Sequence, residues 1–297
     1  MKKKYIIIIF TCIILLGSGY ESYCETFIDS MGRKIKLEKV PERIVSLAPS
    51  ITEILYYLGL GDRVVGVTKF SYYPPEAKQK PDVGSYVKVN IESIITLGPE
   101  IVIGTADGNE PKVVDLLEQA GIDVYIINPR NVRDVIKTIA LIGHVCGVGD
   151  KADKMTRRLN ERVDFVISKV KGRKRPLVFL QINLKPIMTV NHNTFHHDLI
   201  NMAGGINMTG DMEVNYPRIS IEELISKRPE VMIISSMDRG GRFEVARKEW
   251  MQWTSIPAVR DNRVRLIDSD LIDRPSPRIV DGLEAMARII HPDAGWE

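Results

Sequence analysis

Short apolar runs alternate with segments of helical periodicity along most of the chain. The apolar runs are rich in valine and isoleucine and lie at 43–47, 64–67, 101–104 and 124–127, and again at 177–181, 231–235 and 264–267. The segments with a helical spacing of apolar residues lie at 52–58, 91–97, 111–120 and 132–144, and again at 194–202, 221–226, 243–250 and 277–290. Strands that alternate with helices predict parallel sheets covered by helices. We therefore predict an α/β fold with two lobes, each with a central, mainly parallel sheet flanked by helices.

The segment 150–171 differs from both halves because it contains no proline or glycine. Its apolar residues recur on an approximate helical period at Met155, Leu159, Val163, Val166 and Val170. Gly172 follows as a typical helix-end residue, and a helix of this length spans about 33 Å. One stiff helix should permit only small closure motions between the lobes it joins. The expected organisation is an N-terminal lobe over 25–149, the connecting helix over 150–172 and a C-terminal lobe over 173–297.

The two halves share an internal repeat at an offset of 130 residues. The segment 90–103 reads NIESIITLGPEIVI, and the segment 220–233 reads SIEELISKRPEVMI. Both predict a short helix, a turn that contains proline, and a strand. Asn90 and Ser220, at the start of the two helices, are typical N-cap residues. The lobes are therefore expected to be equivalent in fold.

Two pairs of residues occupy matching places in this repeat. Tyr86 and Tyr216 stand six residues before Glu92 and Glu222, respectively. The helix dipole stabilises acidic residues in a first helical turn, so the glutamates are explained without a further role. Tyrosines ahead of helices are likewise most often packing residues. Their occurrence at equivalent points of two lobes nevertheless favours a functional role.

The first residues have the pattern of a secretion signal. Lysines at positions 2–4 precede an apolar run over 5–16 and a stretch of small residues at 17–19. Twelve residues cover about 18 Å as a helix, short of the roughly 30 Å hydrocarbon core, so a signal peptide over 1–24 is favoured over a membrane span. Cleavage is expected after Gly19 or Cys24, and Cys24 is also a candidate for lipid attachment. The mature protein is expected to be periplasmic or otherwise extracytoplasmic.

The cysteine content argues against a fold held by disulfides, and the net charge argues against a nucleic-acid-binding protein. Cys12 lies in the signal and Cys24 at its edge, so only Cys146 remains in the mature body and no disulfide framework is expected. Residues 1–24 carry three lysines and one glutamate, so their removal lowers the formal net charge from +3 to about +1. This balance does not favour a nucleic-acid partner. The roughly 270 remaining residues suffice for two lobes with their own cores.

Six motifs together resemble one known family. They read FIDSMGRKI (27–35), PERIVSLAPSITE (41–53), YPPEA (73–77), VGSY (83–86), AGGIN (203–207) and RPSPRIVDGL (274–283). From about residue 27 to residue 292, the chain resembles the helical-backbone class of ABC-transporter substrate-binding proteins, which includes carriers of vitamin B12, siderophores and haem. The last motif is most similar to the vitamin B12-binding branch.

The resemblance implies a carrier that holds its ligand in a cleft between two lobes. Such proteins have no catalytic residues and no cofactor, and they deliver the ligand to a membrane permease powered by a cytoplasmic ATPase. A monomer is expected. In this family a surface glutamate on each lobe docks onto arginines of the permease, and the matching residues are Glu92 and Glu222. Two charge-assisted pairs, one in each lobe, would fix the orientation on the permease.

The vitamin B12-binding pattern also implies a set of ligand contacts. Position by position, it assigns them to Pro49, Ser50, Phe70, Tyr86, Tyr216, Asp270 and Arg274. A corrin ring is broad, nearly flat and fringed with amides, so it suits aromatic walls and a few hydrogen-bonding groups. The aromatic residues are expected to form the walls, and Asp270 to accept a hydrogen bond from an amide. This chain departs from the pattern of the enteric members of the vitamin B12-binding branch. Those members have tryptophan at two of these aromatic positions, and they have a third wall residue where this chain has Thr105. The polar loop 107–109 is either part of the rim or a plain turn.

A free zinc or manganese ion is one alternative ligand. His192, His196 and His197 form a histidine cluster, and histidine is a common ligand for both metals. Metal-binding relatives spread their ligands over both lobes, whereas the first half contains only His144 near a helix end. The cluster is therefore interpreted as part of a polar loop that leads into the helix at 194–202.

Haem or a ferric siderophore is a second alternative within the same fold. A tyrosinate at Tyr86 or Tyr216 would suit haem iron. Siderophores are commonly anionic, and the arginines available to bind them are Arg218, Arg239, Arg242 and Arg274. These are interpreted mostly as solvated surface charges, and the resemblance makes a corrinoid the preferred ligand.

An enzyme is not expected. Ser46, His192 and Asp198 occur, but no nucleophile elbow, zinc-protease helix, dinucleotide loop or phosphate-binding loop surrounds them.

Overall fold

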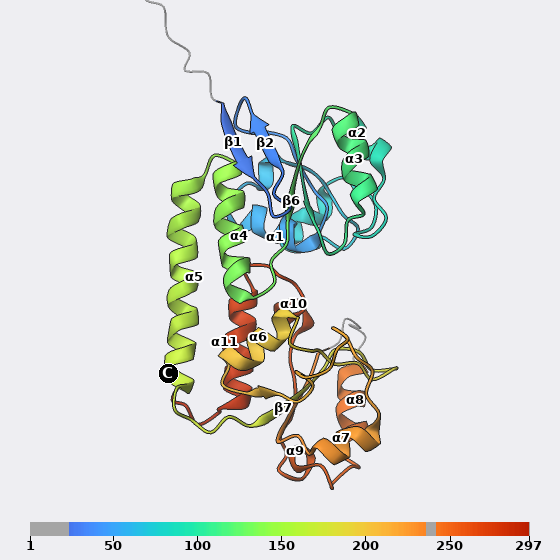
Figure 1. Cartoon of the computed structure of the whole chain (residues 1–297), viewed down its shortest axis with the longest axis vertical. Coiled ribbons are helices and arrows are strands. Elements are labelled where there is room, and N and C mark those ends of the chain that lie inside the picture. The colour runs from blue at the N-terminus through green and yellow to red at the C-terminus, as the bar shows by residue number, and fades with distance from the viewer. Residues whose placement is uncertain (1–23, 236–241, 297) are drawn as a thin grey trace, which may run out of the picture.

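The computed structural model describes residues 24–235 and 242–296 of the chain. The predicted secretion signal, apart from Cys24, lies outside these residues, as does Arg239. The described chain folds into two α/β lobes that follow one another along the long axis of the molecule (Figure 1). A long helix, α5 (Gly149–Val170), runs beside both lobes. The predicted fold class is therefore confirmed.

The N-terminal lobe is built on a four-stranded parallel sheet with the order β4-β3-β5-β6. An antiparallel hairpin of β1 (Glu25–Ile28) and β2 (Lys34–Leu37), which the sequence pattern did not predict, precedes the sheet. The other elements are β3 (Ile44–Ser46), α1 (Pro49–Tyr57), a 3-10 turn (Gly61–Arg63), β4 (Val64–Val67), a second 3-10 turn (Pro75–Gln79), α2 (Ile91–Thr96), β5 (Ile101–Thr105), α3 (Pro111–Gln119), β6 (Asp123–Ile127) and α4 (Val132–Val145).

The C-terminal lobe has a parallel sheet of the same design, with the order β10-β9-β7-β8. Its elements are β7 (Leu177–Gln181), α6 (Phe195–Met202), β8 (Ile206–Asn207), α7 (Ile221–Lys227), β9 (Val231–Ile234), α8 (Arg242–Trp250), α9 (Pro257–Arg260), β10 (Val264–Leu266), α10 (Ser269–Ile272) and α11 (Ile279–Ile290). In each lobe, the strand that comes first in the chain (β3 or β7) lies in the sheet between the strands that come second and third in the chain. The lobes therefore share one topology, as the repeat predicted.

The repeat itself adopts nearly the same structure in both lobes. The helices α2 and α7 begin at the predicted caps, because Asn90 Oδ1 accepts from the backbone N–H of Ser93 at 3.0 Å and Ser220 Oγ accepts from that of Glu223 at 3.1 Å. The buried, half-buried and exposed positions of 91–100 coincide with those of 221–230 except at one place. This agreement extends the equivalence from the backbone to the side chains.

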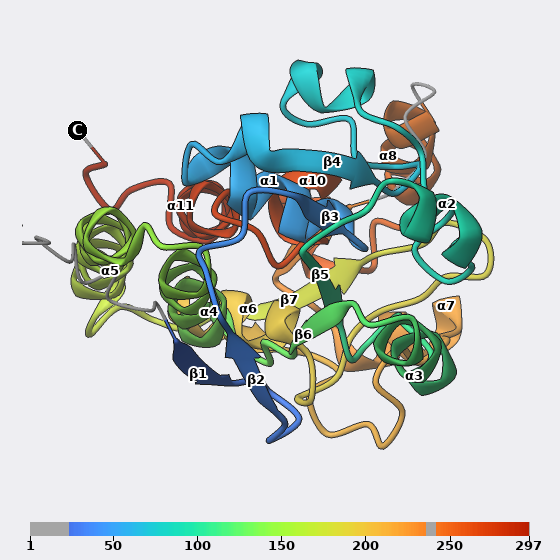
Figure 2. The ribbon, with the colours of Figure 1, turned by 90° about the horizontal axis from the view of Figure 1, so that it is seen from above.

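The connecting helix α5 is held against both lobes. Leu159, Val163, Val166 and Val170 are buried on its inner face, and Gly172 ends it with a φ of 76°. Figure 2 shows α4 and α11 beside α5 on one side of the molecule. Arg162 on α5 also donates to Asp281 at 2.6 Å and to Glu284 at 2.8 Å, both on α11.

One hydrophobic core runs without interruption from one lobe into the other. It includes Ile44 and Ile103 of the first sheet, Ile139 of α4, Val163 of α5 and Leu283 of α11. The outer faces of the two sheets have separate, smaller cores. Because burying a large aliphatic side chain is worth about 1.5–3 kcal/mol, sliding one lobe past the other would expose costly surface. This shared core supports the predicted small amplitude of closure. Among the described residues, no helix combines the length and the apolar character needed to cross a bilayer.

Candidate functional site

The predicted ligand contacts gather where the carboxyl ends of the two sheets face each other. Pro49 and Ser50 begin α1 directly after β3, Phe70 follows β4, and Asp270 and Arg274 follow β10. Tyr86 and Tyr216 precede α2 and α7. In open parallel sheets, ligands bind at the carboxyl ends of the strands. We call these seven residues the inter-lobe site.

Tyr86 is packed tightly against the turn that follows β5. An added Cβ at Gly108 would lie only 1.9 Å from Cζ of the Tyr86 ring. Burial raises the pKa of the Tyr86 phenol to about 12, with smaller contributions from the Asp107 carboxylate and from Tyr216 of the other lobe, while a hydrogen bond with Thr105 acts in the opposite direction. Tyr86 is therefore a half-buried, neutral aromatic surface.

Tyr216 faces the same carboxylate from the C-terminal lobe. The residue is 40% exposed, so part of the aromatic side chain remains accessible. Burial raises the pKa of Tyr216, followed by Asp107 and Asp273, and Arg130 partly offsets the shift. Since the Asp107 carboxylate raises the pKa of both phenols, the hydroxyls of both tyrosines lie near this one carboxylate. Asp107 was predicted only as a member of a polar loop, and its proximity to both tyrosines was not foreseen.

Phe70 lies on an exposed loop that is anchored by buried, hydrogen-bonded hydroxyl groups. Its side chain is 53% exposed. Beneath it, buried hydroxyls form a chain in which Ser46 and Thr52 are 2.8 Å apart, Thr52 and Ser71 are 3.0 Å apart, and Ser71 and Thr68 are 3.1 Å apart. The chain ties the end of β3 and the helix α1 to the Phe70 loop. Ser50, in contrast, is 6% exposed and offers little side-chain surface to a ligand.

Asp270 and Arg274 belong to a polar network that crosses from one lobe to the other. Tyr72 donates its hydroxyl hydrogen to Asp270 Oδ1 at 2.9 Å and accepts a hydrogen bond from Arg274. Arg274 also donates to Glu53 Oε1 at 3.0 Å, and its guanidinium lies 4.5 Å from the centre of the Tyr72 ring. Both predicted contacts are therefore committed to protein partners in this structure.

Glu53 is the centre of this network, and the sequence analysis did not single it out. It lies on α1, is 3% exposed, and accepts from Arg278 Nε at 2.9 Å and from Arg278 Nη2 at 2.7 Å. A buried carboxylate is stable only when it is paired and hydrogen-bonded, and two arginines of the other lobe meet that need. The sequence signals were present, since Glu53 ends one family motif and both arginines lie in another.

A second polar contact joins the lobes at the start of α4. Asp198 on α6 accepts a hydrogen bond from the backbone N–H of Val132 at 2.9 Å. The carboxylate thereby accepts a hydrogen bond from an N–H group that has no partner within the helix. Its negative charge is also stabilised by the positive end of the helix dipole.

The three clustered histidines do not converge on a metal site. His196 is buried and its Nε2 lies 3.0 Å from Asp273 Oδ1, whereas His192 Nδ1 faces the Gly210 carbonyl at 2.7 Å. His197 Nδ1 lies 3.3 Å from the Asn207 amide. Within 24–235 and 242–296, no three His, Cys, Asp or Glu side chains lie where they could hold a metal ion.

Glu92 and Glu222 lie far from the connecting helix. Both are exposed in the first turns of α2 and α7, and neither forms an ion pair with a residue of the described ranges. Figures 1 and 2 place α2 and α7 on the side of the molecule opposite α5, one on each lobe. Two exposed carboxylates on the same side of both lobes are suited to a partner that contacts the two lobes together.

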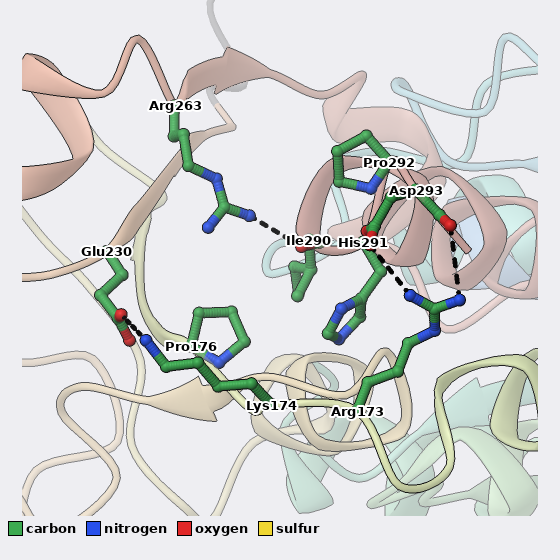
Figure 3. Close-up of a pocket in the computed structure, with 9 residues that line it drawn as sticks. All are labelled: Arg173, Lys174, Pro176, Glu230, Arg263, Ile290, His291, Pro292 and Asp293. Carbon is green, nitrogen blue, oxygen red and sulfur yellow. Dashed lines mark hydrogen bonds and ion pairs between the residues drawn. The ribbon is translucent and has the colours of Figure 1, made fainter.

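A hollow of about 440 Å³ lies on the C-terminal lobe, at the amino ends of its strands. Its charged residues already have partners, because Arg173 pairs with Asp293 at 3.1 Å, Lys174 pairs with Glu230, and Arg263 donates to the Ile290 carbonyl at 2.7 Å (Figure 3). It also lies at the opposite end of the strands from the inter-lobe site. The hollow is therefore explained as part of the packing between α11 and the sheet.

Comparison with known proteins identifies relatives over most of the chain. Residues 44–271 match the family described as periplasmic binding protein. A vitamin B12-binding protein of Vibrio parahaemolyticus is 33% identical over 245 residues, which cover 82% of this chain and 86% of the relative. The crystal structure of the periplasmic vitamin B12-binding protein BtuF of Vibrio cholerae has a TM-score of 0.77 at 30% identity, and the match covers 87% of this chain and 99% of that one. A periplasmic haem-binding protein from Pseudomonas aeruginosa has a TM-score of 0.73 at 28% identity, over 85% of this chain and 94% of that one.

Proposed function

The chain belongs to the periplasmic binding protein family, and on this basis we propose that it binds a corrinoid between its lobes and delivers it to the permease of an ABC importer. Its membership makes it a substrate-binding component of an ABC transporter that works outside the cytoplasm. The permease and its ATPase are the partners that this role requires.

The observation that carries the choice of ligand is the pair of tyrosines, one from each lobe, that lie near Asp107. Tyr86 and Tyr216 come from opposite lobes and offer neutral aromatic surface, and Phe70 adds exposed aromatic surface on the loop after β4. A corrin ring has a broad apolar face and amide side chains at its edge. Aromatic walls with a carboxylate near them match such a ligand, because the carboxylate can accept hydrogen bonds from the amides.

The ionisation of the tyrosines describes the ligand-free site. Burial and Asp107 raise the pKa of both phenols, that of Tyr86 to about 12, so both are neutral at pH 7 while no ligand is bound. A phenol that ligates iron gives up its proton to the metal, so parallel titration with haemin is the measurement that separates tyrosines that act as walls from tyrosines that act as iron ligands.

The arginines and histidines give little support to an anionic siderophore or a free metal ion. Arg274 is neutralised by Glu53 and lies 3.5 Å from Asp270. Arg218 is exposed, and the side chain of Arg242 lies outside the described part of the structure. The histidines are engaged with separate partners, as described above.

Export completes the proposal. A signal peptide over 1–24 would release the mature chain close to Cys24, which is exposed directly before β1. We favour a soluble mature form over a lipid-anchored one, because the residues before Cys24 are a poor lipoprotein signal.

Replacing Tyr86 or Tyr216 with alanine is expected to weaken the binding of cyanocobalamin by about 1–3 kcal/mol, because each change removes one aromatic wall. Replacing either residue with phenylalanine should retain most of the affinity, since the ring remains. Isothermal titration of each variant measures both effects. A phenylalanine variant that loses cyanocobalamin binding as completely as the alanine variant would show that the phenol hydroxyl, rather than the ring, carries the contact. Unchanged affinity in both alanine variants would contradict the site itself.

A further inference from the structure

Tyr86 lies at the tip of the turn 85–88 in the N-terminal lobe. The turn closes through an isolated bridge between Gly84 and Val89 and a hydrogen bond of 2.9 Å from the Ser85 N–H to the Lys88 carbonyl. Gly84 has a φ of 101°, and an added Cβ there would lie 2.6 Å from the Lys88 carbonyl oxygen, so glycine is required for the turn. These contacts define the turn but do not fix the orientation of the Tyr86 ring.

Asn109 ties the main chain of Tyr86 to the end of β5. Its side chain is buried, with only 8% of the residue exposed. Asn109 Oδ1 accepts from the backbone N–H of Thr105 at 2.8 Å, and Asn109 Nδ2 donates to the Tyr86 carbonyl at 3.0 Å. One amide group thereby connects the rigid end of a central strand to the residue that forms the wall.

Gly108 contacts the ring of Tyr86, whereas Asn109 holds its main chain. The Tyr86 ring occupies the space where a side chain at 108 would be, because an added Cβ would lie 1.9 Å from Cζ and 2.2 Å from Cε1. The φ of Gly108 is outside the left-handed region, so alanine can adopt this backbone conformation without strain. The conflict created by a side chain at 108 is therefore specifically with Tyr86.

The Tyr216 segment is held in a different way. Its neighbours Pro217 and Asn215 accept main-chain hydrogen bonds from Thr189 and Asn191, both at 3.0 Å, so a short ladder of backbone bonds sets its position. Tyr86 depends instead on the two residues of the 108–109 turn.

We propose that Asn109 and Gly108 are positioning residues of the ligand site, which hold the Tyr86 ring as a wall before the ligand arrives. The inference rests on the proposed function, because it assigns a role to residues that act through Tyr86. If the Tyr86 ring is already ordered in the free protein, binding does not carry the entropic cost of ordering it. For a rigid macrocycle this raises the affinity without adding a contact. The turn after β5 is thus part of the site although it contributes no aromatic residue.

A double-mutant cycle tests the proposal with cyanocobalamin as the probe. In the otherwise natural chain, Asn109→Ala and Gly108→Ala should each weaken binding by about tenfold. In a Tyr86→Ala background, each should change the affinity by less than about twofold, because there is no ring left to position. Equal losses in the two backgrounds would overturn the proposal, since the residues would then act on the ligand or on the fold without Tyr86.

Thr156→Val provides the control. Thr156 is also buried, on α5, and its hydroxyl donates to the Ala152 carbonyl at 2.9 Å. Its loss removes a buried hydrogen bond from a side chain to a main-chain carbonyl, on a helix that contributes no residue to the inter-lobe site. The affinity of this variant should remain within about twofold of the natural chain, and a tenfold loss would show that the cycle reports general damage.

A measurement without ligand separates this proposal from the proposed function. In protein labelled with ¹³C at tyrosine Cζ, the Tyr86 signal is identified by its absence in Tyr86→Phe and followed with pH. The natural chain should give a pKa of about 12, and Gly108→Ala should bring it toward the ordinary value of about 10 as the ring is displaced into water. An unchanged value in Gly108→Ala would overturn the positioning role, even if cyanocobalamin binds. Failure of cyanocobalamin to bind the natural chain would contradict the proposed function and leave this titration to decide the positioning role.

Discussion

Replacing Glu53 with alanine is expected to lower the free energy of unfolding by about 3–5 kcal/mol, the loss typical when one partner of a buried ion pair is removed. Glu53 is 3% exposed and receives three hydrogen bonds from Arg274 and Arg278 of the other lobe. Without it, two guanidinium groups remain at the lobe boundary, each with a side chain only 15% exposed. Because Arg274 keeps Asp270 at 3.5 Å, the cost arises mainly from the charge of Arg278, which loses its carboxylate partner.

Urea unfolding of the purified variants measures this loss. Glu92→Ala is the matched control, because Glu92 is an exposed glutamate of the same lobe, and its removal should change the free energy of unfolding by no more than about 0.5 kcal/mol. A loss below about 1 kcal/mol for Glu53→Ala would mean that the two arginines find water or other partners easily. The network would then not be a significant link between the lobes.

Substituting both Glu92 and Glu222 with lysine is expected to reduce ligand uptake on the order of 100-fold, while the affinity for the ligand stays within about twofold. Each glutamate is exposed on a helix on the side of the molecule opposite α5, one in each lobe. If each pairs with an arginine of the permease, reversal replaces two attractive contacts with two repulsive ones. The ligand site is formed by other residues and should be unaffected.

Uptake of labelled ligand by cells that depend on this protein, together with titration of the purified variant, separates docking from binding. Asp150→Lys with Glu161→Lys is the control, because it makes the same change in net charge at exposed acidic residues of α5. This control should transport normally. Normal uptake by the Glu92 and Glu222 variant, or a large loss of its ligand affinity, would contradict the docking role.

Most of the fold could be predicted because it depends on local patterns. The strands lie where valine and isoleucine cluster, and α5 begins within one residue and ends within two residues of the predicted connecting helix because its buried positions recur at helical spacing. The equivalence of the lobes followed from the repeat. The hairpin of β1 and β2 was missed, since it is half solvated and lacks a long apolar run.

The site could be predicted only in part. Tyr86 and Tyr216 occupy matching places in a repeat, so sequence alone could pair them. The partners of Glu53 could not be found in this way, because Arg278 is 225 residues away and no local pattern relates the two. The same limit applies to Arg274, which was assigned to the ligand and in the structure pairs with Glu53. The positioning role of the 108–109 turn depends on packing distances that only the folded chain defines.

The central claim is that the inter-lobe site binds a corrinoid, and isothermal titration of residues 25–297 with cyanocobalamin tests it most directly, with haemin, a ferric siderophore and zinc as parallel titrants. The account predicts saturable one-to-one binding of cyanocobalamin with a dissociation constant on the order of micromolar or tighter, equivalent to at least about 8 kcal/mol. No binding of cyanocobalamin, with saturable binding of one of the other titrants, would contradict it and assign the ligand to that class.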